Sequence, residues 1–205
     1  MINTRADLHA YHEADRIALG CRRSFSSLLF NDVWRYQRCL RRLEYRLNSK
    51  ANPLILILAR FRHRRLGRRL GFSIPPNVFG PGLSIAHYGT IVVNPGAQVG
   101  ANCRLHVDVN IGTAAGEREA APTIGDDCYI GPGAKLFGRI VIGPGTAIGA
   151  NAVVDRSFPD GHMTIGGVPA KQISSRGSEG FLLRQESPDR LDRDRDLLST
   201  EHDEH

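Results

Sequence analysis

The sequence predicts a parallel β solenoid behind a helical N-terminal segment, and a six-residue repeat is the main reason. From residue 93 to residue 154 a branched aliphatic side chain returns every six positions, apart from one interruption after residue 111. The repeated positions are Val93, Val99, Leu105, Ile111, Ile124, Ile130, Leu136, Ile142, Ile148 and Val154. Small residues follow most of them, as in Ile142-Gly143 and Ile148-Gly149. A period of six fits neither a helix nor one strand, but it fits stacked coils of short strands whose inward aliphatic residues bury one another.

The segment before the repeat is predicted to be helical. Apolar residues at helical spacing among many arginines indicate helix over residues 5–47, with Trp34 as a packing anchor. A second helix over residues 54–70 is expected to begin after Asn52-Pro53, because proline is tolerated in a first turn, and to end at Gly71.

Charge divides the chain into three segments. Residues 1–71 carry 16 arginines and lysines against 5 acidic residues, residues 72–173 carry 6 against 7, and residues 174–205 carry 5 against 9. We therefore expect a basic α-helical segment over 1–71, a solenoid domain over 72–173 and a charged, disordered tail over 174–205.

The second predicted helix changes character halfway along its length. Residues 54–59 are apolar all round, and the turns that follow hold six arginines. Two interpretations remain open: the helix from Leu54 to Leu70 lies on the anionic inner face of a membrane, or it packs on the solenoid with a solvated basic face. Aromatic stacking residues do not alternate with the arginines, so no nucleic-acid partner is expected.

The composition argues for a cytoplasmic protein. No run of about 18 apolar residues is present, so no membrane span is expected, and the charged N-terminus does not resemble a signal peptide. Cys21, Cys39, Cys103 and Cys128 show no CxxC spacing and no pairing with histidines at zinc-finger distances. We expect four reduced, mostly buried thiols and no metal site.

The repeat is irregular in two places, where binding groups tend to lie. Phe79, Ile85 and Ile91 form a first coil two residues out of register, which predicts a bulge in the wall near residues 87–94. A polar insertion follows at residues 113–123, and residues 165–171 are expected to form one last strand that closes the solenoid.

Candidate catalytic residues come from the polar positions on the solenoid wall, which are His87, Asn94, His106, Asp108 and Asn110. One coil uses about 18 residues, and neighbouring coils lie about 4.8 Å apart. With the two-residue slip, His87 is expected above residue 107, between His106 and Asp108. Histidine is the natural general base near neutral pH, and a carboxylate can hold its tautomer.

Two phrases of the sequence resemble a known family. The run GPGLSIAHYGTIVVN (residues 80–94) and the run GVPAK (residues 167–171), together with the hexads, are similar to hexapeptide-repeat acyltransferases of the serine acetyltransferase type. The likeness covers roughly residues 30–173 and is strongest to the short members associated with exopolysaccharide and capsule synthesis. It implies a left-handed parallel β-helix and a homotrimer with acetyl-CoA in the groove between subunits.

The same resemblance assigns roles to residues. It implies that His87 is the general base for direct acetyl transfer from acetyl-CoA to a hydroxyl, with His106 and Asp108 beside it and Asn94 and Asn110 as substrate-binding residues. The residues implied to contact acetyl-CoA are Gly131, Gly149, Ala150 and Ala152, along which the pantetheine arm would lie, and Lys171, which would meet a CoA phosphate.

Departures from the family pattern bear on the acceptor. Ala86 stands where serine acetyltransferases carry an aspartate, and Ala120-Ala121 stand where they carry an Arg-His pair. The aspartate that orients the histidine is expected near Phe72 or Ser73 and is missing. These departures favour a neutral acceptor, a sugar or related alcohol in exopolysaccharide or capsule synthesis, with Asp108 as the replacement orienting group.

Three alternatives are weighed against that interpretation. The first is a serine O-acetyltransferase of cysteine biosynthesis. The second is a zinc-dependent hydratase like the γ-type carbonic anhydrases, for which three histidines are needed and His87, His106 and the more distant His162 are available. The third is a noncatalytic scaffold.

Overall fold

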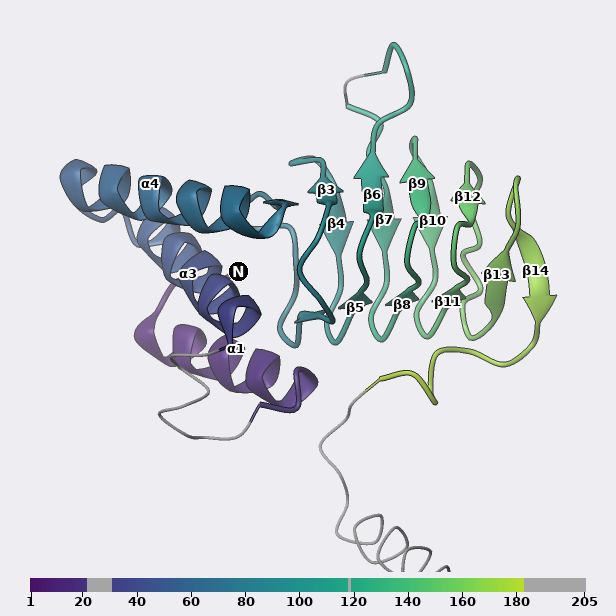
Figure 1. Cartoon of the computed structure of the whole chain (residues 1–205), viewed down its shortest axis with the longest axis horizontal. Helices are drawn as coiled ribbons and strands as arrows, with labels where there is room; N and C mark the ends of the chain where they lie inside the picture. Colours follow the sequence, from purple (N-terminus) through teal and green to yellow (C-terminus); the bar gives the residue numbers. More distant parts are fainter. Residues whose placement is uncertain (22–30, 118, 183–205) are drawn as a thin grey trace, which may run out of the picture.

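Three helices stand at one end of a solenoid of short strands in the computed structural model, which describes residues 1–21, 31–117 and 119–182 (Figure 1). The helices are α1 (Arg5–Ala18), α3 (Asp32–Asn48) and α4 (Pro53–Leu70). Helix α1 is followed by Gly20 with a φ of 65°, a left-handed conformation that glycine adopts without steric cost. One helix over residues 5–47 is therefore wrong. Residues 22–30 lie outside the described residues.

The other helix signals are confirmed. Asn52 accepts a hydrogen bond from the Leu54 N–H at the start of α4, Pro53 occupies its first turn, and Gly71 ends it with a φ of 82°. Trp34 is 5% exposed and meets His12 edge to face, as expected of a packing anchor. No helix within the described ranges is long and apolar enough to cross a membrane.

The solenoid consists of short strands that stack along its axis (Figure 1). The strands are β1 (Phe72–Ser73), β2 (Ser84–Ile85), β3 (Ile91–Val93), β4 (Gln98–Val99), β5 (Arg104–Leu105), β6 (Val109–Gly112), β7 (Thr123–Ile124), β8 (Tyr129–Ile130), β9 (Lys135–Phe137), β10 (Val141–Ile142), β11 (Ala147–Ile148), β12 (Val153–Val154), β13 (Thr164–Gly166) and β14 (Lys171–Ser174). They form three sheets, ordered β1-β3-β6-β9-β12, β10-β7-β4 and β14-β13-β11-β8-β5-β2. All neighbours are parallel except β13 and β14. The predicted parallel solenoid is confirmed.

The six-residue repeat supplies the core. Val93 pairs with Ile111 and Ile130 pairs with Ile148, so each aliphatic position stacks on its counterpart one coil later. Every repeat position from Val93 to Val154 is buried, with 4% exposure or less. Residues two positions earlier also point inward, because side chains alternate along a strand. Cys103 and Cys128 occupy such positions, and all four cysteines are free and buried, as expected.

Both irregularities of the repeat take the predicted places. Ile85 pairs with Leu105, 20 residues later, whereas Val93 pairs with Ile111, 18 residues later. Two extra residues therefore enlarge the corner between β2 and β3. Ile111 pairs with Leu136, 25 residues later, because the insertion between β6 and β7 leaves the coil as a protruding loop (Figure 1).

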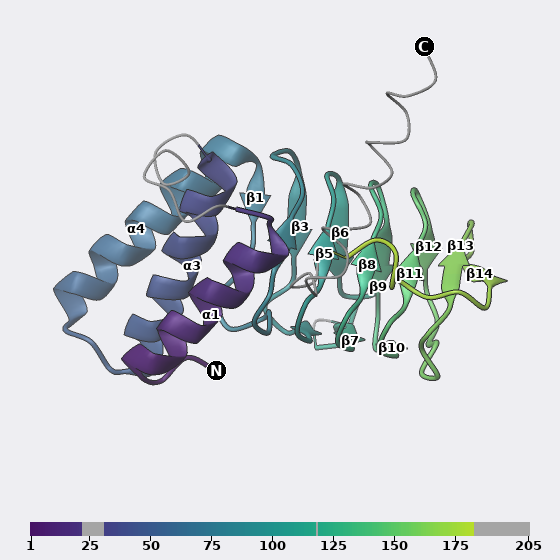
Figure 2. The same ribbon diagram turned by 90° about the horizontal axis from the view of Figure 1, so that it is seen from below.

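The C-terminal end of the solenoid differs from the expectation. Two strands, β13 and β14, close it as an antiparallel pair instead of one strand over residues 165–171. Residues 175–182 then turn back along the sheet toward β8 (Figure 2). Ser178 is fully buried there, donating its N–H to Gly145 O at 2.9 Å and its hydroxyl to Asp127 O. A disordered tail from residue 174 is thus wrong for residues 174–182, and residues 183–205 lie outside the described residues.

A buried ionic network joins the helices to the first coil. The Arg41 guanidinium lies 2.8 Å from the Asp15 carboxylate and 3.0 Å from that of Glu44, with all three side chains buried. It also donates to Phe79 O at 2.9 Å and to Gly80 O at 2.6 Å. Because a buried charge is costly unless it is paired and hydrogen-bonded, this network fixes the helices against the chain that leads to β2.

Candidate active site

His87 lies in the enlarged corner between β2 and β3 and is exposed to solvent. Helix α3 holds the strand that leads to it. The Gln37 side chain donates to Leu83 O at 2.6 Å and accepts from the Ile85 N–H at 3.3 Å. Asp15 accepts from the Leu83 N–H at 2.9 Å. The helical cap therefore positions the corner that carries His87.

His106 follows β5 on the next coil and faces His87. The centroids of the two rings are 6.4 Å apart, so the predicted meeting of these histidines is confirmed geometrically. Burial, with the charges of Arg104 and His87, lowers the pKa of His106 from its ordinary value. No described residue is a hydrogen-bond partner for its buried Nε2. Burial therefore favours the neutral form of the His106 ring.

Two aromatic residues that were not predicted extend this pair into a row. The Tyr129 ring lies 5.0 Å from His106, and the Phe181 ring lies 4.9 Å from Tyr129, centroid to centroid. Tyr129 stands in register with Arg104, one coil away on the same sheet. The repeat alone is enough to predict the register of Tyr129. It does not predict the position of Phe181, because that position depends on the fold-back of residues 175–182.

Asp108 does not contact His87. Its carboxylate lies 3.1 Å from the Lys135 ammonium, which also donates to Asp108 O at 2.5 Å. The Asp108 side chain is 63% exposed, and the residue has a φ of 61°, as befits a tight corner. Its contacts are those of a corner residue paired to the next coil, so the orienting role expected for it has no support in the geometry.

The two asparagines lie on the sheet formed by β1, β3, β6, β9 and β12. Asn94 follows β3 and its Oδ1 accepts from the Gly96 N–H at 2.8 Å, a local turn contact. Asn110 lies within β6, between Val92 and Lys135 in register. His87 precedes β3 and Asn94 follows it, so the strand separates Asn94 from the two histidines.

A column of small residues continues the corner that holds His106. Each residue of this column donates its backbone N–H to a carbonyl on the next coil. The bonds run from Ala86 to Leu105 O, from His106 to Ile130 O, from Gly131 to Ile148 O and from Gly149 to Ile165 O. The lack of a side chain at Gly131 is structural, because a Cβ there would lie 2.7 Å from Ile148 O. At Gly149 a Cβ would lie 3.4 Å from Ile165 O, which is ordinary contact. The fold does not require glycine at 149.

The other residues expected to contact acetyl-CoA differ in how exposed they are. Ala150 is exposed at the same corner, but Ala152 is fully buried in the core and cannot touch a ligand. Ala152 lies two positions before Val154, and that spacing should have marked it as inward. Lys171 lies on β14, at the opposite end of the six-stranded sheet from β2. Five strand spacings separate the two strands, roughly 24 Å, so Lys171 could meet only the far end of an extended ligand.

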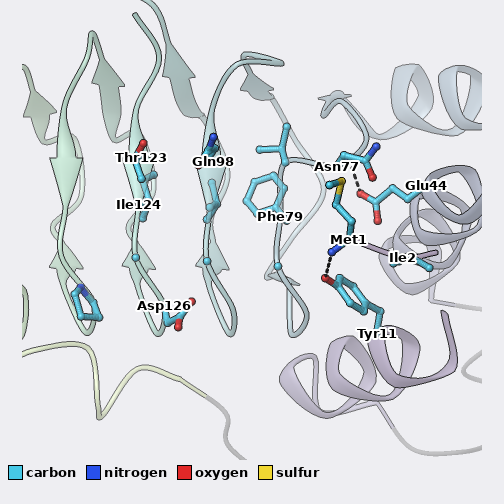
Figure 3. Close-up of a pocket in the computed structure, with 16 residues that line it drawn as sticks. Met1, Ile2, Tyr11, Glu44, Asn77, Phe79, Gln98, Thr123, Ile124 and Asp126 are labelled. Atoms are coloured by element: carbon cyan, nitrogen blue, oxygen red, sulfur yellow. Dashed lines mark hydrogen bonds between the residues drawn. The ribbon is translucent and has the colours of Figure 1, made fainter. Parts of the chain in front are cut away.

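A cavity of about 730 Å³ lies between the helical end of the molecule and the sheet of β4, β7 and β10 (Figure 3). The N-terminus and helices line one side with Met1, Tyr11 and Glu44, and the sheet of β4, β7 and β10 lines the other with Gln98 and Thr123. Neither histidine lines it. We take His87 as the candidate base, because histidine is the natural general base near neutral pH. Within the described ranges, no cluster of three His, Cys, Asp or Glu residues could hold a metal ion.

Comparison with known proteins agrees with this architecture. Residues 121–156 match the family described as bacterial transferase hexapeptide (six repeats). A serine acetyltransferase from Mycobacterium tuberculosis is 35% identical over 135 residues, which are 63% of this chain and 58% of the relative. One from Bacillus pumilus is 33% identical over 118 residues, 56% of this chain and 54% of the relative. The chain thus spans a little over half the length of these curated relatives.

Solved structures of serine acetyltransferases also resemble this fold. Neisseria gonorrhoeae serine acetyltransferase superposes with a TM-score of 0.70 at 27% identity, over 83% of this chain and 68% of that one. A Brucella abortus serine acetyltransferase in complex with coenzyme A gives 0.68 at 25% identity, over 83% and 67%.

The fold and the repeat are therefore similar to those of bacterial hexapeptide-repeat transferases. More particularly, the relatives and solved structures that the chain resembles are serine acetyltransferases.

The expectation of a sugar acceptor in exopolysaccharide or capsule synthesis is wrong. The relatives and structural neighbours are named serine acetyltransferases, which favours the alternative, serine. The expectation rested on a few positions: Ala86, Ala120-Ala121 and the missing aspartate near Phe72 or Ser73. Other side chains can supply the charges that such positions lack, so their loss does not define the acceptor.

Proposed function

We propose that this protein is a serine O-acetyltransferase that uses acetyl-CoA as its acyl donor. The observation that carries the proposal is the pairing of His87 with His106 at the enlarged corner of a serine acetyltransferase-type solenoid. Release of free CoA thiol from acetyl-CoA, dependent on L-serine and lost in His87→Ala, is the test.

In the proposed reaction, the His87 imidazole takes the proton from the serine hydroxyl as its oxygen attacks the thioester carbonyl carbon. The tetrahedral intermediate then expels CoA thiolate, which takes the proton from the His87 imidazolium. The products are O-acetylserine and CoA, and no acyl-enzyme forms. Backbone N–H groups would stabilise the oxyanion.

His106 is the proposed positioning residue for His87. Its lowered pKa keeps its ring neutral near pH 7, so it places no competing positive charge beside the His87 imidazolium. Its ring lies 6.4 Å from that of His87 and 5.0 Å from that of Tyr129, centroid to centroid. A base fixed in this way loses less freedom in the transition state.

Arg104 is the proposed partner of the serine carboxylate. It lies two residues before His106 on β5, is partly exposed, and its charge contributes to the lowered pKa of His106. A guanidinium matches a carboxylate in a two-pronged geometry. It would replace the cationic pair that Ala120-Ala121 cannot provide.

The proposed path of acetyl-CoA follows the small-residue column. Gly149 and Ala150 leave the corner beyond His106 open, and Lys171 at the far end of the sheet would meet a CoA phosphate. A related enzyme has been solved with coenzyme A, which supports the donor.

We further propose a left-handed β-helix that assembles as a homotrimer in the cytoplasm, where acetyl-CoA is available. His87 is exposed on the single chain. A neighbouring subunit would complete the walls of the site and exclude water from it. The similarity to serine acetyltransferases supports the same assembly.

A further inference from the structure

One face of α4 is apolar and exposed. Leu54, Ile57, Leu58 and Phe61 are 76%, 61%, 65% and 55% exposed. Their spacing of three and four residues places them on one stripe of the helix. Scattered surface leucines need no explanation, but a contiguous stripe of four large apolar side chains marks a contact surface.

The opposite face of α4 already has its partners. Ala59, His63, Gly67 and Leu70 are the buried residues of this helix. His63 stacks on Tyr36 of α3 with ring centroids 5.2 Å apart, and a Cβ at Gly67 would lie 2.7 Å from Phe72 O. Because α3 lies between α1 and α4 (Figure 2), the apolar stripe faces away from the helical cap.

The charge around the stripe is strongly positive. On the helix turns that follow Phe61, exposed Arg64, Arg65 and Arg68 continue the same face, and α4 contains no acidic residue. A hollow of about 300 Å³ beside it is lined by Arg35, Arg62, Arg65, Leu66 and Arg69. The carboxylate of Asp32 lies 3.0 Å from Arg35 and 3.9 Å from Arg69.

We propose that this surface, the α4 face, binds the surface of an anionic lipid bilayer. It is defined by Leu54, Ile57, Leu58, Phe61, Arg64, Arg65 and Arg68. The apolar side chains would enter the boundary between headgroups and acyl chains, and the arginines would meet lipid phosphates. A second copy of the chain fits less well, because it would bring two arginine-rich helices together without acidic residues between them. The proposal is independent of the acetyl acceptor.

The test is flotation of the full chain with vesicles. Vesicles of equal parts phosphatidylcholine and phosphatidylglycerol are expected to carry the protein upward at 0.1 M salt, and pure phosphatidylcholine vesicles are expected to leave it behind. Leu54→Ser/Leu58→Ser/Phe61→Ser should reduce the bound fraction at least tenfold. Arg64→Gln/Arg65→Gln/Arg68→Gln should do the same and weaken the dependence on salt.

Matched controls distinguish binding through the α4 face from nonspecific hydrophobic binding. Val168→Ser/Ile173→Ser removes two side chains that are 73% and 65% exposed near the other end of the chain, and binding should be unchanged. Thermal unfolding should be unaltered in all variants, because every altered side chain is exposed. Wild-type protein that stays behind with both kinds of vesicle would overturn the proposal. So would a fall in oligomeric mass of the Leu54→Ser/Leu58→Ser/Phe61→Ser variant in light scattering, since the face would then join two copies.

Discussion

The imidazole rings of His87 and His106 lie 6.4 Å apart, centroid to centroid, although they belong to different coils of the solenoid. The register of β2 on β5, in which Ile85 pairs with Leu105, places the residues that follow these two strands beside one another. Two extra residues then enlarge the corner that carries His87, because the 20-residue register of Ile85 and Leu105 is followed by the 18-residue register of Val93 and Ile111. The first break in the repeat is therefore the feature that converts a structural wall into a candidate catalytic site.

The first prediction concerns what positions His87. His106→Ala should lower kcat about tenfold, equivalent to about 1.4 kcal/mol, with KM for both substrates within about twofold. The reason is that a positioning contact acts on the transition state more than on substrate binding. Asp108→Ala is the matched control and should keep wild-type kcat, because Asp108 pairs with Lys135. A larger loss in Asp108→Ala than in His106→Ala would reverse the assignment.

The second prediction concerns Arg104. Arg104→Gln should raise KM for L-serine about tenfold or more while KM for acetyl-CoA changes little, because a charge-assisted contact to the carboxylate is lost. Steady-state kinetics with each substrate varied in turn measures both constants. Arg139→Gln, at an exposed position elsewhere on the solenoid, should leave both unchanged. A selective rise in KM for acetyl-CoA in Arg104→Gln would place Arg104 in the donor site instead.

The third prediction concerns the acetyl-CoA path. Gly149→Leu should raise KM for acetyl-CoA about tenfold with little change in the unfolding temperature, since a Cβ at this position makes only ordinary contacts. Gly131→Leu should instead destabilise the fold, because its Cβ would collide with Ile148 O. Thr123→Leu, exposed on another sheet, is the control for a bulky outward side chain. An unchanged KM for acetyl-CoA in a folded Gly149→Leu protein would remove Gly149 from the path.

The fourth prediction concerns stability and pH. Burial, with the charge of Arg64, lowers the pKa of His63 to about 4 from 6.5. Between about pH 6.5 and pH 4, His63 is protonated in the unfolded chain but neutral in the folded protein. The free energy of unfolding should therefore fall as pH drops from 7 to 4. Denaturant titrations across this range should show a shallower fall in His63→Phe, with the remainder due partly to His12, whose pKa burial also lowers to about 4.

Tyr36→Phe is the control for this effect. It removes the hydroxyl that lies 3.0 Å from His63 Nε2 but keeps the imidazole buried. The slope with pH should persist, because burial is the main cause of the lowered pKa. A slope that disappears in Tyr36→Phe and survives in His63→Phe would contradict this explanation.

The sequence predicted the solenoid well because a period is a collective signal. Each aliphatic position from Val93 to Val154 must point inward for the coils to stack, so many residues report the same fact. The register slip could also be counted along the chain, and it located His87 relative to His106. Helix ends were less predictable: the break after Ala18 depends on Gly20 alone, a single glycine within an otherwise helical pattern.

The site was only partly predictable. The repeat determines where a residue lies along the solenoid wall, but it does not determine which other segments pack against the outside of that wall. Phe181 reaches Tyr129 through a fold-back that buries Ser178, and no local pattern encodes that return. Asp108 lies on the coil expected for it, but its carboxylate pairs with the Lys135 ammonium instead of orienting His87. Ala152 was mistaken for a wall residue, although the alternation of side chains places it in the core.

The central claim is that His87 acts as the base in acetyl transfer to serine. The most direct measurement is the rate of CoA thiol release from acetyl-CoA with and without L-serine, for the wild-type protein and for His87→Ala. We expect serine-dependent turnover by the wild type and a loss of about 10²–10⁴-fold in kcat for His87→Ala, with an unchanged unfolding temperature. Serine-dependent turnover that survives undiminished in His87→Ala, or a wild-type protein that releases no thiol with serine, would contradict the account.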